Sequence, residues 1–106
     1  MTSFDKREEA FEQQFAHDEE LRFKATARRN KMLGLWAAEK LGLSGAEADS
    51  YALSVVMAAF EDSTHDVVSK IRKDFDAKGV AQSDHQITRQ MTELMAIAIQ
   101  DIKAGR

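Results

Sequence analysis

Cysteine and proline are both absent from the 106 residues of this chain. The absence of cysteine excludes disulfides, thiolate metal ligands and a cysteine nucleophile, and it favours a reducing compartment. The absence of proline removes the strongest internal breaker of helices. No apolar run has the roughly 18 residues of a membrane span, and the acidic N-terminus does not resemble a secretory signal. We therefore expect a cytoplasmic protein without direct membrane insertion.

Acidic residues slightly outnumber basic ones, so the net charge is -3. Residues 1–24 hold seven acidic side chains against four basic ones, whereas residues 25–106 balance at eleven of each. Phosphate neutralisation supplies most of the affinity of non-specific nucleic-acid binding, so an acidic chain argues against nucleic acid as a partner. The length and the 43% apolar content suit a single globular domain.

Local signals divide the chain into helices. A serine followed three residues later by an acid or a glutamine predicts helix starts at Ser44–Glu47, Ser63–Asp66 and Ser83–Gln86. Glycines predict helix ends at Gly42, Gly79 and Gly105. No segment alternates with period two, so no strand is predicted. The expected fold is all-α, a compact four-helix bundle with antiparallel neighbours.

Apolar residues at helical spacing predict which face of each helix is buried. In the second helix and the third, these residues are Ala48, Ala52, Val55 and Ala59, then Val67, Ile71 and Phe75. In the last helix they are Ile87, Met91, Leu94, Ala98 and Ile102, with Met95 and Ile99 beside them. In the first helix they are Phe23, Ala27, Leu33, Ala37 and Leu41.

Residues 1–18, here called the arm, carry a separate aromatic stripe. At 100° per residue, Phe4, Phe11 and Phe15 lie within an arc of about 40°, turned by roughly 100° from the apolar line of the following helix. The two lines cannot share one flat interface, so we predict an arm at 1–18 and a helical bundle at 19–106. The rings have three possible uses: covering a groove of the bundle, fraying with a terminus, or folding onto a partner.

A basic cluster and a tryptophan mark the stretch that follows. Arg28, Arg29 and Lys31 form a tight basic cluster, and Trp36 lies at the edge of the core face. The arginines either extend over the bundle and pair with acids or hold phosphate oxygens, with a nearby ring stacking on a base. The phosphate-binding loop and the dinucleotide fingerprint are both absent, so a nucleotide would be a regulatory ligand rather than a substrate.

The sequence offers little for catalysis. His17, His65 and His85 are scattered, with no spacing typical of a metal site. The serines mostly take capping positions, and no nucleophile motif occurs. We therefore expect no metal, no required cofactor and no enzyme. His17 stands beside Asp18 and Glu19, so a gain of its proton at low pH is one further hypothesis.

Three motifs give the sequence a family resemblance. F-x-H-D at 15–18, A-R-R-N-K at 27–31 and G-L-W-A-A-E-K-L-G-L-S-G at 34–45 resemble the zeta subunits of alphaproteobacterial F-type ATP synthases. The resemblance implies a small regulatory protein whose arm inserts into the catalytic head and blocks ATP hydrolysis. It also implies contact with the alpha, beta and gamma subunits, a place at the inner membrane through the synthase, and regulatory binding of ADP or ATP.

Particular residues of this chain are our candidates for these roles. We expect the arm to bind its partner through Phe4, Arg7, Glu8, Phe11 and Phe15. The candidate nucleotide-binding residues are Arg28, Arg29, Lys31 and Trp36. The free protein is expected to be a monomer. The alternative function is a helical adaptor that senses nucleotide without inhibiting the enzyme.

Overall fold

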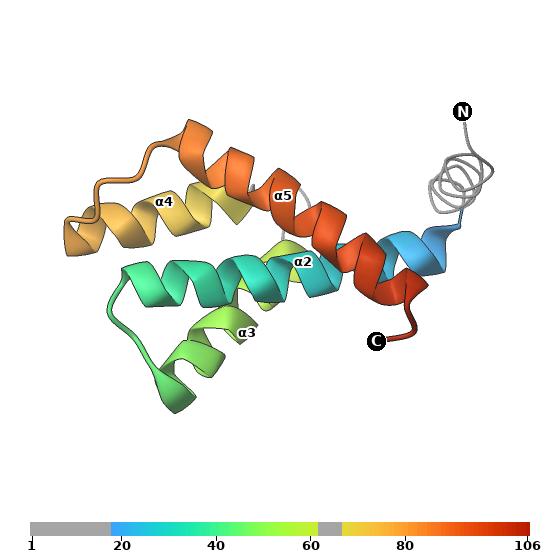
Figure 1. The fold of residues 1–106 in the computed structure, drawn as a ribbon. Helices are drawn as coiled ribbons and strands as arrows, with labels where there is room; N and C mark the ends of the chain where they lie inside the picture. Colours follow the sequence, from blue (N-terminus) through green and yellow to red (C-terminus); the bar gives the residue numbers. More distant parts are fainter. Residues whose placement is uncertain (1–17, 62–66) are drawn as a thin grey trace.

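The computed structural model describes residues 18–61 and 67–106, and within these ranges the chain forms four α-helices and no strand. The helices are α2 (Glu19–Lys40), α3 (Gly45–Glu61), α4 (Val67–Lys78) and α5 (Asp84–Lys103), joined by short connections (Figure 1). The prediction of an all-α, four-helix fold is confirmed.

Side-chain caps fix the starts of two helices. The Ser83 hydroxyl accepts the backbone N–H of Gln86 at 3.2 Å, and the Gln86 side chain accepts the backbone N–H of Ser83 at 2.8 Å, which completes the predicted capping box. The Asp18 carboxylate accepts the backbone N–H of Leu21 at 3.1 Å and caps α2. Asp18, the last residue of the predicted arm, therefore belongs structurally to the first described helix.

The other two predicted starts have different outcomes. α3 begins at Gly45, directly after Ser44, so this start is confirmed. The start predicted at Ser63–Asp66 lies outside the described residues, and α4 begins just after it at Val67.

Glycine ends three of the helices, as predicted. The glycines are Gly42, Gly79 and Gly105, with φ of 80°, 71° and 74°. After α4, the N–H of Gly79 donates to the carbonyl of Asp76 at 3.3 Å, and the N–H of Val80 donates to that of Phe75 at 2.9 Å. This pair of bonds is the Schellman pattern, which needs a left-handed residue at the glycine position.

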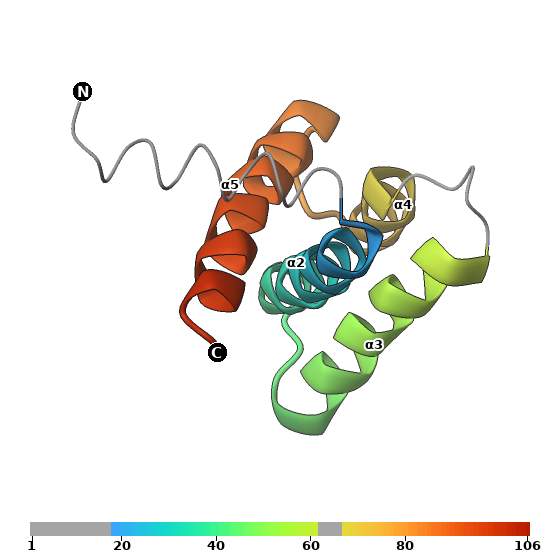
Figure 2. The same cartoon turned by 90° about the vertical axis from the view of Figure 1, so that its right-hand side faces the viewer.

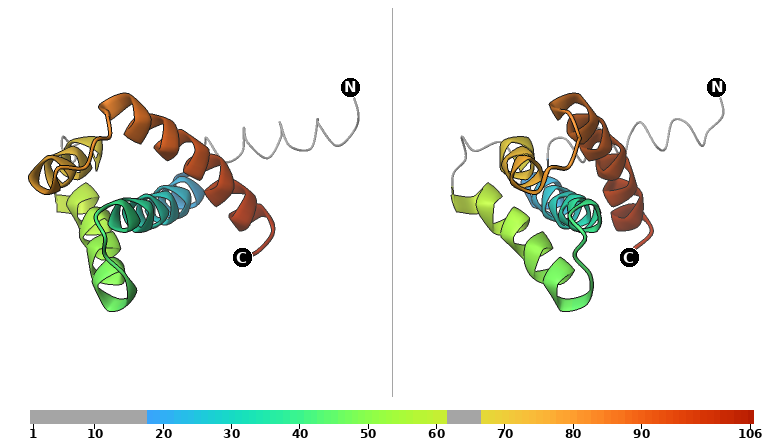
Figure 3. Two further views of the ribbon diagram at one scale, coloured as in Figure 1. Left: turned by 60° about the vertical axis from the view of Figure 1, so that its left-hand side comes forward. Right: turned by 90° about the vertical axis from the view of Figure 1, so that its left-hand side faces the viewer.

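α2 is the central helix of the described fold. It packs between α3 and α5, whose backbones do not approach each other closely within the described residues, while α4 packs against α3 and α5 and touches α2 (Figures 2 and 3). A helix with neighbours on several sides must be apolar or small on those sides. Its buried residues are Ala25, Asn30, Leu33, Gly34, Ala37 and Ala38. This position explains why the stretch from Met32 to Ala38 is apolar almost all round.

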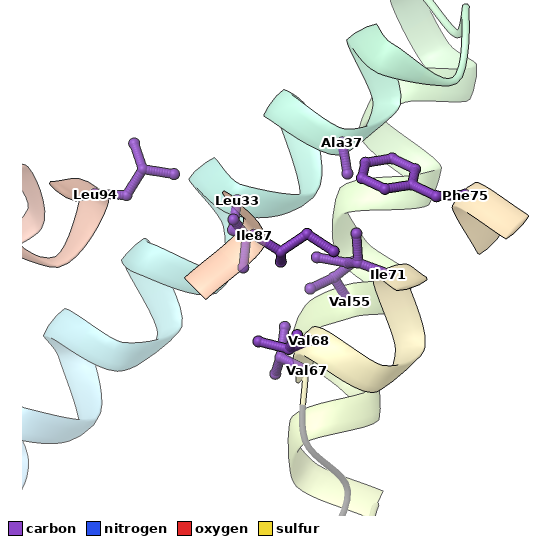
Figure 4. Close-up of a cluster of buried hydrophobic side chains, with 9 residues drawn as sticks. All are labelled: Leu33, Ala37, Val55, Val67, Val68, Ile71, Phe75, Ile87 and Leu94. Carbon is purple, nitrogen blue, oxygen red and sulfur yellow. The ribbon is translucent and has the colours of Figure 1, made fainter. Parts of the chain in front are cut away.

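The hydrophobic core combines residues from all four helices (Figure 4). It consists of Leu33, Ala37, Val55, Val67, Val68, Ile71, Phe75, Ile87 and Leu94. The predicted faces of α3, α4 and α5 do turn towards the core, although not every predicted residue is fully buried. The buried ones are Ala52, Val55, Val67, Ile71, Phe75, Ile87, Leu94 and Ala98. The partly buried ones are Ala48, Ala59, Met91 and Ile102. Burial of one such large side chain stabilises the fold by about 1.5–3 kcal/mol.

The prediction that Phe23 belongs to the core face of α2 is wrong. The residue is 56% exposed. With a rise of 1.5 Å per residue, Phe23 lies about 15 Å along the axis from Leu33, beyond the core cluster. At that end of α2 the buried residue is Ala25, which lies on almost the opposite side of the helix.

Candidate functional site

The face formed by α2 and α3 exposes most of the large apolar side chains at the surface of the described residues. Leu53, Met57 and Phe60 of α3 are 60%, 47% and 56% exposed. The Phe60 ring contacts the ring of Phe23 from α2, with centroids 5.3 Å apart and planes inclined at 55°. These four residues form one surface, here called the Phe23–Phe60 face.

A small pocket opens between the two helices beside these rings. Its volume is about 160 Å³, and its lining is mostly apolar. The lining residues are Phe23, Thr26, Ala27, Asn30, Val56, Ala59 and Phe60. We call it the ring pocket.

A second hollow on the same face carries charge. It has a volume of about 630 Å³ and is lined by Ala27, Arg28, Lys31, Asp49, Leu53 and Val56. Arg28 and Lys31 are three residues apart, so helical geometry sets them on neighbouring positions of α2. We call this the basic hollow, although Asp49 reduces its positive charge.

Arg29 lies apart from the other two cations. It lines a different hollow, of about 400 Å³, with Met91, Met95 and Ile99 of α5 among its neighbours. Its guanidinium donates to the Asn30 side-chain oxygen from Nε at 3.1 Å and from Nη2 at 2.9 Å. Because Asn30 is only 2% exposed, these bonds satisfy a buried oxygen that water cannot reach.

Trp36 is also separate from the basic hollow. It is half-buried and packs against the core, where its ring meets the edge of Phe75 with centroids 5.8 Å apart. Thus the structure brings Arg28 and Lys31 together and places Arg29 and Trp36 elsewhere. The arm candidates Phe4, Arg7, Glu8, Phe11 and Phe15 lie outside the described residues, as do His17 and His65.

A polar clamp joins α3 to α4 away from these hollows. The Tyr51 hydroxyl donates to Asp74 Oδ2 at 2.7 Å, and Lys70 Nζ donates to the same oxygen at 3.0 Å. Lys70 also lies 5.2 Å from the centre of the Tyr51 ring. Burial raises the pKa of Tyr51 strongly, and the hydrogen bond to Asp74 raises it further, so the hydroxyl remains a donor at physiological pH. The clamp is explained by stability alone.

Features of other site classes do not appear in the described residues. Residues 18–61 and 67–106 contain no group of three or more side chains able to hold a metal ion. None of the helices in those ranges is both long and apolar enough to cross a bilayer. His85 is exposed in the first turn of α5.

The described part therefore defines a small helical protein with a closed core and one face suited to binding other molecules. The model of the family described as ATPase inhibitor subunit zeta matches residues 1–101, and the chain belongs to this family. The resemblance given by the three motifs is confirmed. The family is one of regulatory ATPase inhibitors rather than enzymes.

The chain is also similar to a solved structure. A protein known from a solution NMR structure is 41% identical to this chain and matches it with a TM-score of 0.69. The match covers 81% of this chain and 99% of that one. A search among curated proteins finds no match.

Proposed function

We propose that this protein inhibits the F-type ATP synthase by inserting residues 1–18 into its catalytic head, which blocks ATP hydrolysis. The observation that carries the proposal is the family match, which begins at residue 1 and so includes the arm. The head's alpha, beta and gamma subunits are the proposed partners, and the protein would be cytoplasmic, at the membrane only through the synthase. The free protein is proposed to be a monomer.

The core of the described residues is built from the four described helices. All nine core residues lie between Leu33 and Leu94, on the four described helices. Three phenylalanines in the arm would each contribute about 2–3 kcal/mol on burial against a partner, before the cost of ordering the segment. A rotary enzyme stops when one catalytic interface cannot close, so binding energy alone is sufficient for inhibition.

Removal of residues 1–17 is the decisive experiment. Asp18 is kept because its carboxylate caps α2. The truncated protein should retain its helix content and melting temperature, since the core residues are all present, but should lose inhibition of the purified enzyme. Far-UV circular dichroism and steady-state ATP hydrolysis provide the two measurements. Full inhibition by residues 18–106 would refute the arm mechanism.

Two full-length variants separate the rings from the rest of the arm. The first carries Phe4→Ala, Phe11→Ala and Phe15→Ala, and should lose inhibition nearly as completely as the truncation. The second carries Gln13→Ala and Gln14→Ala, which leave the stripe intact, and should inhibit like the wild type. Equal inhibition by both variants would show that the rings are not the anchors.

A second candidate function is regulatory binding of ADP or ATP. It is favoured because Arg28 and Lys31 both line the basic hollow. Two cations on one wall can hold phosphate oxygens through charge-assisted hydrogen bonds. The neighbouring apolar side chains Leu53 and Val56 offer a surface for a base. We propose that the phosphates bind at Arg28 and Lys31.

Charge removal in the hollow tests nucleotide binding. Arg28→Gln with Lys31→Gln should weaken ADP binding about tenfold or more, since a hydrogen bond to a charged group is worth about 1.5–3 kcal/mol. Lys40→Gln, at an exposed position near the end of the same helix, is the matched control and should bind normally. An ADP titration followed by amide NMR measures both. Equal affinity for the double variant and the control would contradict the assignment.

A further inference from the structure

The hollow between α2 and α5 brings two thioethers close to a cation. Its volume is about 400 Å³ and it opens to solvent, with Met91 and Met95 lining it from α5 and Arg29 lining it from α2. The two methionines are four residues apart, so they are neighbours on one face of α5. We call this the methionine hollow. Neither function proposed above uses the two methionines.

Both methionines lie where solvent meets the packed interior. Met91 is half-buried and packs against the hydrophobic core, and Met95 is half-buried one turn further along. Leu94 and Ala98, beside them on α5, are buried. The two sulfur-containing side chains are therefore open to small solutes in the hollow while they also fill the seam between α5 and α2.

A methionine thioether in such a position is a target for a hydroperoxide. The sulfur lone pair attacks one oxygen of hydrogen peroxide, the O–O bond breaks and a sulfur–oxygen bond forms. The other oxygen leaves as water and carries both peroxide protons. The sulfur loses two electrons and the peroxide gains two, so no further reactant is needed. An apolar, flexible side chain becomes a polar sulfoxide.

The new oxygen would enter a place where the buried polar groups are already paired. The Arg29 guanidinium donates from Nε and Nη2 to the side-chain oxygen of Asn30, which is only 2% exposed. A sulfoxide oxygen is a strong acceptor that competes for the same planar guanidinium. If the guanidinium turns to it, the Asn30 oxygen loses its donors. If not, a polar sulfoxide remains against the apolar core, and in both cases the packing of α5 on α2 weakens.

We propose that Met91 and Met95 form an oxidation-sensitive site, which loosens α5 from α2 when a hydroperoxide converts them to sulfoxides. The site gives an oxidant response to a chain that has no cysteine. Dedicated reductases convert methionine sulfoxide back to methionine, so the change is reversible.

Met57 separates oxidation at the hollow from oxidation elsewhere. It is 47% exposed on α3, so peroxide reaches it at least as readily as the half-buried methionines. Its sulfoxide would remain in water and leave the core unchanged. Oxidation of Met57 alone should therefore have no effect on stability.

Peroxide treatment of the isolated full chain tests the site. Peptide mass spectrometry measures the sulfoxide at each methionine. Once Met91 and Met95 are oxidised, the melting temperature should fall by about 4 °C or more, because a buried polar group without a partner is costly in a domain of this size. Unchanged melting with both residues oxidised refutes the site. Resistance of both residues while Met57 is fully oxidised refutes it equally.

Local and reversible effects are measured on the same sample. Amide hydrogen exchange should increase more in α5 than in α3, because α5 is the helix that loosens. The two stereospecific classes of methionine sulfoxide reductase should restore both the exchange and the melting temperature. A uniform increase over all helices, or no recovery after complete reduction, would contradict the proposal.

Leucine variants identify the residues responsible. Met91→Leu with Met95→Leu nearly conserves volume, so the double variant should fold, and it should keep its melting temperature after peroxide treatment. Met57→Leu is the matched control and should lose stability like the wild type. Met91→Leu alone gives a second measurement if the double variant does not fold, and it should retain most of the protection because Met91 packs against the core. Equal losses in the wild type and the leucine variants at the hollow would assign the effect to another residue and overturn the proposal.

Discussion

Replacing Gly34 by leucine is expected to destabilise the protein by about 3 kcal/mol, although leucine is much the better helix former. Gly34 is buried in the middle of α2, and a Cβ added there would lie 2.6 Å from the Cα of Ala52 in α3. It would also lie 3.2 Å from both the Cβ and the carbonyl oxygen of Ala52. Carbon atoms prefer a separation of about 3.5–4.0 Å, so the side chain overlaps a backbone that cannot rotate away.

Substitution of Gly34 by alanine tests the balance between helix propensity and steric overlap. Helix propensity alone would make Gly34→Ala stabilising by about 1 kcal/mol. Separating two packed helices to relieve the overlap typically costs about 1–3 kcal/mol, so we expect a net loss of about 1 kcal/mol. Leucine gains nearly the same helix propensity but places more volume between α2 and Ala52. The leucine variant should therefore lose more of the free energy of unfolding than the alanine variant.

Chemical and thermal unfolding measure this series. A loss of 3 kcal/mol should lower the melting temperature by more than about 12 °C, because each kcal/mol corresponds to about 4–8 °C for a domain of this size. Ala96→Gly, at an exposed position within α5, calibrates the propensity effect in the same protein. If Gly34→Ala proves more stable than the wild type, α2 and α3 are not held as closely as described.

The helix boundaries could be predicted because their causes are local. The Ser83 capping box and the glycine ends depend on residues no more than a few positions apart, and the chain reveals such neighbours directly. The buried faces of α4 and α5 were equally accessible, since each has one dominant apolar stripe. The three motifs identified the family for the same reason, as they are read along the chain.

Tertiary packing decided what the sequence could not reveal. α3 is apolar over a broad arc, and helical periodicity predicts its buried side at Ala52 and Val55 but does not show that Leu53, Met57 and Phe60 remain exposed. The close contact of Gly34 with Ala52 joins residues 18 positions apart, so no local pattern announces it. Helical spacing predicts Phe23 on the same face of α2 as Leu33 and Ala37. The helices that cover this face of α2 do not extend as far as Phe23, so its ring remains exposed.

The spacing of residues within the basic cluster indicates which of them can share a site. Arg28 and Arg29 are adjacent in sequence, and adjacent residues point about 100° apart on a helix. The grouping of Arg28 with Arg29 did not use this angle, and the structure places Arg28 at the basic hollow and Arg29 against α5. Spacing of three or four residues, as between Arg28 and Lys31, is the better guide to a shared site.

The Phe75→Ala variant should lose about 3–5 kcal/mol of stability, the largest single effect that we expect. Phe75 is completely buried, and its ring packs against Trp36 in the centre of the core. Truncation to alanine removes the transfer energy of the ring and leaves a cavity that α2 and α4 can only partly fill. Small domains are stabilised by about 5–15 kcal/mol in total, so the variant should be partly unfolded near physiological temperature.

Phe60→Ala is the matched control for this prediction. The same chemical change at a 56% exposed ring leaves no closed cavity, and its cost should stay below about 1 kcal/mol. The two variants are compared by urea unfolding under identical conditions. We expect Phe75→Ala to weaken inhibition only through its folded fraction, whereas Phe60→Ala should remain folded. If both lose the same stability, the Phe60 ring is buried as deeply as that of Phe75, and the exposed position of Phe60 is wrong.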